Sequence, residues 1–306
     1  MKLVFTDAET LGNIKPDKFK ELGDVKIYDF TNPQETLSRV KNADIVLTNK
    51  VVINKDIIDK SNIKMIQVLA TGTNNIDTDY AKSKGITVKN VTDYSTNSVA
   101  QLTFATVLNI MNKLNYFDSY SKTEYHKSNT FTHIKDFHEL NSKTWGIIGL
   151  GNIGKKVASI AEAFGCNVIY YSTSGKNNNE KYKRATLQEV LKSDIISIHA
   201  PLNKNTFNLL NSDNLNSIKK GAILVNMGRG GIVNENDLAK IIDKRGFFAA
   251  FDVFTKEPID KNNPLLKVKN IILTPHIAWA SLEAREKLIN KAFENVKSFI
   301  KSYQKQ

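Results

Sequence analysis

Residues 145–154, which read WGIIGLGNIG, constrain the fold more than any other part of the chain. Small apolar residues typical of a buried strand run into Gly149-x-Gly151-x-x-Gly154, and an apolar helix pattern follows at once. The first glycine permits a tight turn, the second lets a pyrophosphate approach the backbone, and the third lets helix and strand pack closely. The start of the helix also offers free N–H groups to a phosphate. We therefore expect a dinucleotide-binding turn, with an ordinary strand-to-helix turn as the alternative.

The length of 306 residues gives room for two domains, each with its own core. The composition is that of a globular protein, and no apolar run approaches the roughly 20 residues that span a bilayer. The first seven residues, MKLVFTD, read as a strand and lack the features of a signal peptide. We therefore expect a cytoplasmic protein that does not cross a membrane.

The chain is basic, with 43 Lys and Arg against 31 Asp and Glu and a net charge of +12. Such a charge can indicate a nucleic-acid partner or an attraction for small anions. The lysines are scattered along the whole chain, and no run of five basic residues occurs. We expect a lysine-rich surface that helps to attract small anions, and no nucleic-acid partner.

One cysteine and a cluster of histidines bear on metal and redox chemistry. Cys166 is the only cysteine and follows an apolar helix pattern, so we expect a buried structural thiol. His126, His133 and His138 lie in residues 115–140, which are polar and aromatic with no clear period. Their spacing fits no compact metal-ligand pattern, so we expect no metal site. Because this segment is longer than an ordinary loop, we expect an arm that reaches a partner subunit.

Short β-branched runs alternate with helix-period stretches along both halves of the chain, which predicts parallel sheets with helices on both faces. The expected strands are residues 2–7, 25–28, 44–48, 65–69 and 87–90, then 144–149, 167–171, 194–199, 222–226, 247–252 and 271–273. The expected helices are residues 16–22, 33–41, 54–61, 77–84 and 95–114, then 151–164, 187–192, 212–218, 234–243 and 281–300.

The last helix follows the final strand of the second set and can pack back on the first set. We therefore expect two doubly wound α/β domains with a cleft between them. A flavodoxin-like substrate domain takes residues 1–96 and 280–306, and a Rossmann-like nucleotide domain takes residues 97–279, including the arm at 115–140.

Three charged residues follow three strands of the second set. Arg229, Glu257 and His276 come just after the strands that end near residues 226, 252 and 273. Each alone can be structural, as a surface arginine, a solvated carboxylate or a helix-cap or core histidine. Together they fall at the carboxyl edge of one sheet, where open α/β sheets bind ligands.

The chemistry of these side chains suits the reduction of a 2-oxo acid. A guanidinium grips a carboxylate with two hydrogen bonds and polarises a neighbouring carbonyl. A histidine donates a proton to a carbonyl oxygen as hydride reaches the carbon, and a carboxylate beside it favours the imidazolium form. We therefore expect Arg229, Glu257 and His276 to form a catalytic site.

The chain resembles the D-isomer-specific 2-hydroxyacid dehydrogenases over essentially its whole length. Residues 94–101 (YSTNSVAQ) and Trp279 are closest to the glycerate dehydrogenase, or hydroxypyruvate reductase, branch. The motifs that carry the resemblance, in this order, are Gly149-x-Gly151-x-x-Gly154, Asn226-x-Gly228-Arg229-Gly230, Asp252-Val253-Phe254-x-x-Glu257-Pro258 and Pro275-His276-Ile277-Ala278-Trp279.

The resemblance implies roles for individual residues. Arg229 binds the substrate carboxylate and carbonyl, His276 is the acid/base, and Glu257 pairs with His276. Asp252 meets the nicotinamide carboxamide, and family members are usually homodimers built through the nucleotide domain. The implied substrate contacts are Thr71, Gly72, Thr73, Arg229, His276 and Trp279. The implied cofactor contacts are Gly149, Gly151, Asn152, Ile153, Gly154, Ala200, Pro201, Thr206, Met227, Gly228, Arg229, Asp252 and His276.

The chain departs from an NAD-type pattern after the strand at residues 167–171. An acidic residue normally ends this strand, about 20 residues after the glycines, and binds the ribose hydroxyls. Here the strand is followed by Ser172-Thr173-Ser174-Gly175-Lys176. Nothing there repels a 2′-phosphate, and the hydroxyls and the lysine suit one. We therefore expect NADPH preference or dual use of NAD and NADP, with a flexible loop that binds NADH as the alternative.

These features predict an NAD(P)-dependent D-2-hydroxyacid dehydrogenase that reduces a small 2-oxo acid of the hydroxypyruvate or glyoxylate type. A D-lactate-type or broad 2-ketoacid reductase is an alternative. Phosphoglycerate dehydrogenase fits less well, because many of its members carry a further regulatory domain. A different class, a non-catalytic dinucleotide-sensing protein, stays open, although Arg229, Glu257 and His276 are all present.

Overall fold

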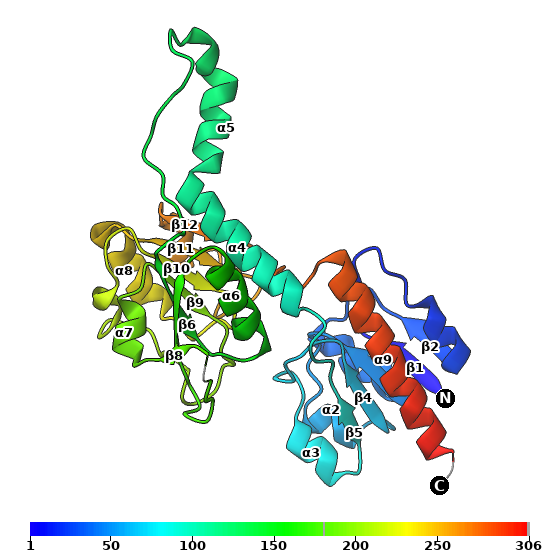
Figure 1. Ribbon diagram of the computed structural model, residues 1–306. Coiled ribbons are helices and arrows are strands. Elements are labelled where there is room, and N and C mark those ends of the chain that lie inside the picture. Colours follow the sequence, from blue (N-terminus) through cyan, green and yellow to red (C-terminus); the bar gives the residue numbers. More distant parts are fainter. Residues whose placement is uncertain (180, 305–306) are drawn as a thin grey trace. The chain divides into compact units, whose positions relative to one another are not determined.

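The computed structural model describes residues 1–179 and 181–304 and contains two compact units (Figure 1). The first unit combines Met1–Ser95 with Ala280–Gln306, and the second is Thr96–Trp279. Each contains a parallel sheet flanked by helices, which confirms the doubly wound α/β class expected from the sequence.

The first unit has five parallel strands in the order β2-β1-β3-β4-β5, the flavodoxin-like order. The central strands β3 and β4 are buried at every residue, as their unbroken apolar runs require in a sheet covered on both faces. Helices α1, α2 and α3 share one apolar core with the strands, and α9 contacts β4. The strands are β1 (Lys2–Phe5), β2 (Asp24–Ile27), β3 (Ile45–Thr48), β4 (Met65–Val68) and β5 (Thr87–Lys89). The helices are α1 (Thr36–Val40), α2 (Lys55–Asp59), α3 (Thr78–Ser83) and α9 (Leu282–Tyr303).

The second unit has seven parallel strands in the order β12-β11-β10-β9-β6-β7-β8, which is the Rossmann order extended by one strand. Helices α4 and α6 pack on one face of this sheet, and α7 and α8 pack on the other. The buried Trp145 of β6 donates a hydrogen bond of 2.8 Å from Nε1 to Ser197 Oγ of β9. The strands are β6 (Thr144–Ile148), β7 (Asn167–Tyr171), β8 (Lys183–Arg184), β9 (Ile195–Ile198), β10 (Ile223–Asn226), β11 (Phe248–Phe251) and β12 (Ile271–Leu273). The helices are α4 (Thr96–Asn112), α5 (Leu114–Thr123), α6 (Asn152–Ala163), α7 (Leu187–Leu191) and α8 (Glu235–Arg245).

Some segments expected as α-helices are short 3-10 helices instead. Pro16 and Gly23 bound a 3-10 helix at Asp17–Leu22. The segment expected at residues 33–41 starts with a 3-10 helix at Pro33–Glu35, which has a capping box at its N-terminus, before α1 begins. Only Leu215–Ser217 of the segment expected at residues 212–218 is helical. Asparagine side chains bond to the backbone around this last segment and compete with a regular helix.

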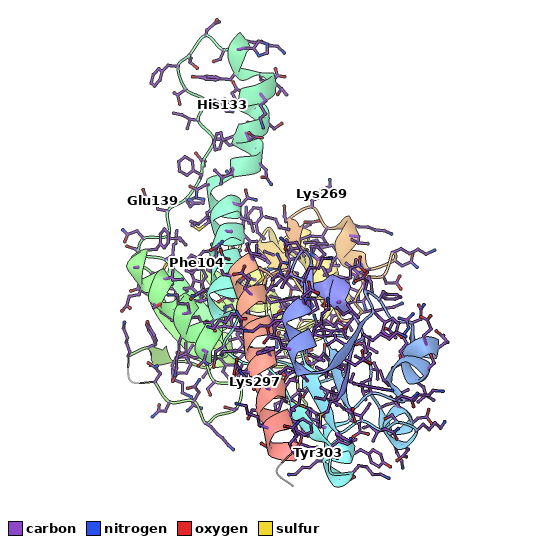
Figure 2. All side chains as sticks on the ribbon, turned by 90° about the vertical axis from the view of Figure 1, so that its right-hand side faces the viewer. Phe104, His133, Glu139, Lys269, Lys297 and Tyr303 are labelled. Carbon is purple, nitrogen blue, oxygen red and sulfur yellow. The ribbon has the colours of Figure 1, made fainter. Side chains whose placement is uncertain are left out.

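The segment at residues 115–140, which showed no period in the sequence, opens with the helix α5. Lys113 adopts a left-handed conformation (φ 53°) that separates α5 from α4. Figure 1 shows α5 and the returning chain extending away from the β6–β12 sheet, and Figure 2 shows His133 on the returning chain. His133 stacks on Tyr120 at a ring separation of 3.7 Å and shares a 2.8 Å hydrogen bond with Tyr116 Oη. The helical period was hidden because these aromatic side chains pack on the returning chain rather than on a core.

No helix in residues 1–179 and 181–304 is long and apolar enough to cross a membrane. Over the same residues, no three His, Cys, Asp or Glu side chains form a group that could hold a metal ion. Cys166 is buried as expected, and this burial raises the pKa of its thiol to about 11.

Candidate active site

The glycine-rich turn between β6 and α6 has the shape that a pyrophosphate needs. Gly149 has a φ of 94°, and a Cβ atom there would come within 2.8 Å of the backbone nitrogen of Ala200. Gly151 has no atom within 4 Å of the equivalent position, so the space in front of the turn is open. The helix α6 begins at Asn152, and its first N–H groups therefore face this space. These residues fit a dinucleotide, and Gly149, Gly151 and Gly154 occupy the positions that the sequence suggested.

The loop after β9 lies beside this turn and is internally braced. Thr206 is fully buried, and its hydroxyl donates to the carbonyl of Pro201 at 2.7 Å. The same hydroxyl accepts a hydrogen bond of 2.8 Å from the N–H of Asn203. Thr206 therefore holds the shape of the loop that carries Ala200 and Pro201 past Gly149.

His276 and Glu257 form a close pair at the carboxyl edge of the second sheet. His276 Nδ1 lies 2.6 Å from Glu257 Oε2, and the two side chains are 21% and 27% exposed. Glu257 is held in turn by the N–H of Phe254, which donates to Oε1 at 3.0 Å. Because Nδ1 is engaged by the carboxylate, Nε2 is the ring nitrogen that can exchange a proton with a substrate. His276 also has a φ of 55°, an unusual value for a residue other than glycine.

Asp252 fixes the loop on which His276 sits. It is 1% exposed, and Oδ1 accepts hydrogen bonds from Thr274 Oγ1 at 2.6 Å and from the Ile277 N–H at 2.8 Å. Oδ2 accepts from the N–H of Ala278 at 2.8 Å. Burial raises the pKa of Asp252, while these three hydrogen bonds act in the opposite direction. Asp252 thus ties the end of β11 to both sides of His276, a positioning role that the sequence did not reveal.

Arg229 follows β10, the strand next to β11 in the sheet. Its Nη1 donates to the carbonyl of Gly228 at 2.8 Å, and its own carbonyl accepts from Asn226 Nδ2 at 3.0 Å. Asn226 Oδ1 also accepts from the Gly228 N–H at 3.1 Å. The buried Asn226 therefore shapes the turn that carries the half-buried Arg229 beyond the strand end, after the buried Met227.

The turn after β7 is anchored to the glycine-rich turn. Ser172 is 5% exposed, and its hydroxyl accepts from the N–H of Asn177 at 3.2 Å. Asn177 Nδ2 in turn donates to the carbonyl of Leu150. Ser174 and Lys176 lie at the exposed tip of the turn, and Thr173 is half-buried. Asn177 had no signal in the sequence, because its role depends on a contact with a residue 27 positions away.

In the first unit, the loop after β4 carries Thr71, Gly72 and Thr73. The Thr71 hydroxyl donates to the carbonyl of Val91 at 3.0 Å, and the Thr73 carbonyl accepts from the Ile76 N–H at 2.9 Å. At the end of the neighbouring β3, the carboxylate of Asp7 accepts the N–H groups of residues 49–51. Nothing in the sequence indicated that Asp7 binds the loop after β3, because no local pattern connects Asp7 with residues 49–51.

The motifs and the fold agree with comparisons to known proteins. A family model described as "D-isomer specific 2-hydroxyacid dehydrogenase, NAD binding domain" matches residues 104–278. The chain belongs to the D-isomer-specific 2-hydroxyacid dehydrogenase family. It is therefore an oxidoreductase that acts on the CH–OH group of donors with a nicotinamide cofactor.

Relatives of this dehydrogenase are similar over their full length. A hydroxypyruvate reductase from Blautia hydrogenotrophica is 37% identical, and the match covers 98% of this chain and 97% of that protein. A glycerate dehydrogenase from Methylorubrum extorquens is 33% identical, covering 98% of this chain and 96% of that protein. Among solved structures, the acyclic imino acid reductase Bsp5 in complex with NADPH and D-Arg superposes with a TM-score of 0.88 at 31% identity. That match covers 99% of this chain and 98% of the Bsp5 chain.

Proposed function

We propose that this dehydrogenase reduces a small 2-oxo acid of the hydroxypyruvate or glyoxylate type to the D-2-hydroxy acid. The observation that carries the proposal is the 2.6 Å pair of His276 and Glu257 at the carboxyl edge of a Rossmann sheet. The names of the relatives, hydroxypyruvate reductase and glycerate dehydrogenase, support the substrate class.

The proposed chemistry divides between Arg229 and His276. When bound, the nicotinamide cofactor supplies a hydride to C2 of the substrate. Arg229 binds the substrate carboxylate and polarises the C2 carbonyl, as the planar guanidinium suits both tasks. His276 donates the proton from Nε2 to the carbonyl oxygen, and Glu257 stabilises the imidazolium before this transfer and holds the ring in place. Because Asp252 fixes the backbone on both sides of His276, the ring is positioned before substrate arrives.

We propose further contacts for cofactor and substrate. The first N–H groups of α6, at Asn152, Ile153 and Gly154, suit a pyrophosphate. The loop residues Ala200, Pro201 and Thr206 and the turn residues Met227 and Gly228 complete the proposed cofactor site. The backbone of Thr71, Gly72 and Thr73, together with Trp279, is the proposed additional site for substrate.

The turn after β7 favours NADPH, alone or alongside NADH. Ser172 stands where a ribose-binding carboxylate is usual, so nothing at the strand end repels a 2′-phosphate. The exposed Ser174 and Lys176 can bind one, helped by Thr173. The buried Ser172 contributes by bracing the turn through Asn177.

We also propose that the protein is a homodimer and that residues 115–140 are the dimer arm. Large apolar side chains of this arm are exposed, including Phe131 at 91% and Ile134 at 83%. Monomeric proteins rarely leave such a cluster in water, and a second copy of the arm would cover it. Sedimentation of the wild type and of a Phe131→Ser, Ile134→Ser double variant tests this, and a wild type that sediments as a monomer contradicts it.

The reductase proposal is tested by following NADPH and NADH oxidation at 340 nm with hydroxypyruvate, glyoxylate, pyruvate and phenylpyruvate. We expect the highest kcat/KM with hydroxypyruvate or glyoxylate, and the ratio between cofactors measures the NADPH preference. A preference for pyruvate or phenylpyruvate would replace the substrate class with that of a D-lactate-type or broad 2-ketoacid reductase. No turnover with any of the four acids and either cofactor would contradict the proposal.

A further inference from the structure

The short strand β8, which the sequence did not predict, brings an arginine to the turn after β7. In the parallel register of β7 and β8, Arg184 is the partner of Tyr170. Tyr170 is buried in the core shared with α6, and residues paired in register on neighbouring parallel strands point to the same face of the sheet. Arg184 therefore leaves β8 on the face of α6, beside the end of β7.

The guanidinium of Arg184 reaches the tip of the turn after β7. Its Nη2 atom lies 3.9 Å from the position that a Cβ atom on Gly175 would take. Gly175 has a φ of 71°, and its N–H donates to the carbonyl of Ser172 at 3.2 Å, which closes the turn. The guanidinium therefore lies close to the tip of the turn.

The turn beside this arginine carries no carboxylate before Glu180. Residues 167–179 contain no Asp or Glu, and Lys176 and Lys183 flank the same turn and strand. The nearby acid Glu162 is paired with Lys181 at 2.5 Å. Among residues 1–179 and 181–304, the structure shows no ion pair for Arg184.

The turn itself is held rigidly by groups that point inward. The Tyr170 hydroxyl donates to the carbonyl of Asn177 at 3.3 Å and accepts from the Asn179 N–H at 3.0 Å. Ser172 Oγ and Asn177 Nδ2 add the braces described above. The exposed side chains beside this turn include Ser174, Lys176, Asn178 and Arg184.

We propose that Arg184 is the residue that selects the 2′-phosphate of NADPH, with Ser174 and Lys176 completing the anion site. The site lies at the end of β7, where a Rossmann sheet receives the adenosine ribose. A guanidinium binds a phosphate with two parallel charge-assisted hydrogen bonds, which a lysine cannot make. In this proposal Ser172 only avoids repelling the phosphate, and the attraction comes from a side chain of β8. This inference rests on the proposed use of NADPH.

The test is calorimetric binding of two fragments that differ only in the phosphate, adenosine 2′,5′-bisphosphate and adenosine 5′-monophosphate. Arg184→Gln is expected to weaken binding of the bisphosphate about tenfold, or about 1.4 kcal/mol, and to change binding of the monophosphate less than twofold. Arg184→Lys is expected to recover only part of the loss. Lys183→Gln is the matched control, because the adjacent strand position faces the other side of the sheet, and it should leave both affinities unchanged.

Three results would overturn the inference. The first is an Arg184→Gln variant that binds the bisphosphate as tightly as the wild type. The second is an equal loss for both fragments, which indicates a structural role for Arg184. The third is a wild type that binds both fragments equally, which also removes the NADPH preference. In that case turnover of oxo acids with NADH still decides the reductase proposal separately.

Discussion

His199 is expected to make the second unit sensitive to acid. It directly follows β9, and its N–H donates to the carbonyl of Ile148 at 2.9 Å. The residue as a whole is half-buried, but both ring nitrogens are inaccessible and have no hydrogen-bond partner among the described residues. Because the proton resides on these nitrogens, burial lowers the pKa of His199 from 6.5 to about 3. Replacing His199 by Leu removes this group at similar volume.

The sign and size of the effect follow from this pKa. Between pH 6.5 and 3 the unfolded chain binds a proton at His199 and the folded chain does not, so stability falls as the pH falls through this window. At pH 5.0 the pH is about 1.5 units below the pKa of His199 in the unfolded chain. Protonation of the unfolded chain then lowers the free energy of unfolding by about 2 kcal/mol. At pH 7.5 the contribution is close to zero. When the pH is lowered from 7.5 to 5.0, the free energy of unfolding of His199→Leu should therefore fall by about 2 kcal/mol less than that of the wild type.

Urea unfolding followed by tryptophan fluorescence measures this difference in the second unit, which contains His199. The chain has two tryptophans, Trp145 and Trp279, and both belong to the second unit. Unfolding free energies are compared at pH 7.5 and 5.0 for the wild type, His199→Leu and the control His126→Gln. His126 is exposed on the arm, so its variant should keep the wild-type pH dependence. An equal pH dependence in His199→Leu and the wild type would show that the buried His199 ring does not cause the loss of stability in acid.

Two further predictions concern ligand binding. Arg229→Ala should raise the KM for hydroxypyruvate at least tenfold, since a charge-assisted hydrogen bond contributes about 1.5–3 kcal/mol. The Kd for NADPH, measured by fluorescence titration, should stay within about twofold, and an unchanged KM would contradict the substrate role. Ser172→Asp restores the carboxylate of an NAD-type site, so it should weaken NADPH binding about tenfold and leave NADH binding unchanged or tighter. Calorimetry with both cofactors checks this, and a variant that still favours NADPH as the wild type does would contradict it.

The sequence predicted the fold well where strands are buried on both faces. The ranges expected at residues 44–48 and 65–69 contain β3 and β4, which are unbroken buried runs with few polar residues. The strand β8 was missed because Lys183–Arg184 is too short and too polar for any periodic pattern. The helix α5 was missed because its aromatic residues contact the returning chain of the arm rather than a sheet.

Residues of the candidate site could be predicted from the sequence only where they lie in a short motif that follows a strand. The glycine turn, Arg229, Glu257 and His276 each follow a strand, and parallel strands end at one edge of a sheet. Asp252, Asn177 and Arg184 instead contact residues that are distant in the sequence and close in the folded structure. Such contacts arise from tertiary packing, which local patterns do not encode.

In the proposed reaction, His276 supplies the proton as the substrate is reduced. Single-turnover mixing of the NADPH-loaded enzyme with hydroxypyruvate, followed at 340 nm, measures this step directly in the wild type and in His276→Ala. General acid catalysis contributes about 10²–10⁴-fold, so the rate should fall by that factor in the variant while the Kd for NADPH stays close to the wild-type value. A single-turnover rate in His276→Ala close to that of the wild type would contradict the proposed role of His276 as the proton donor.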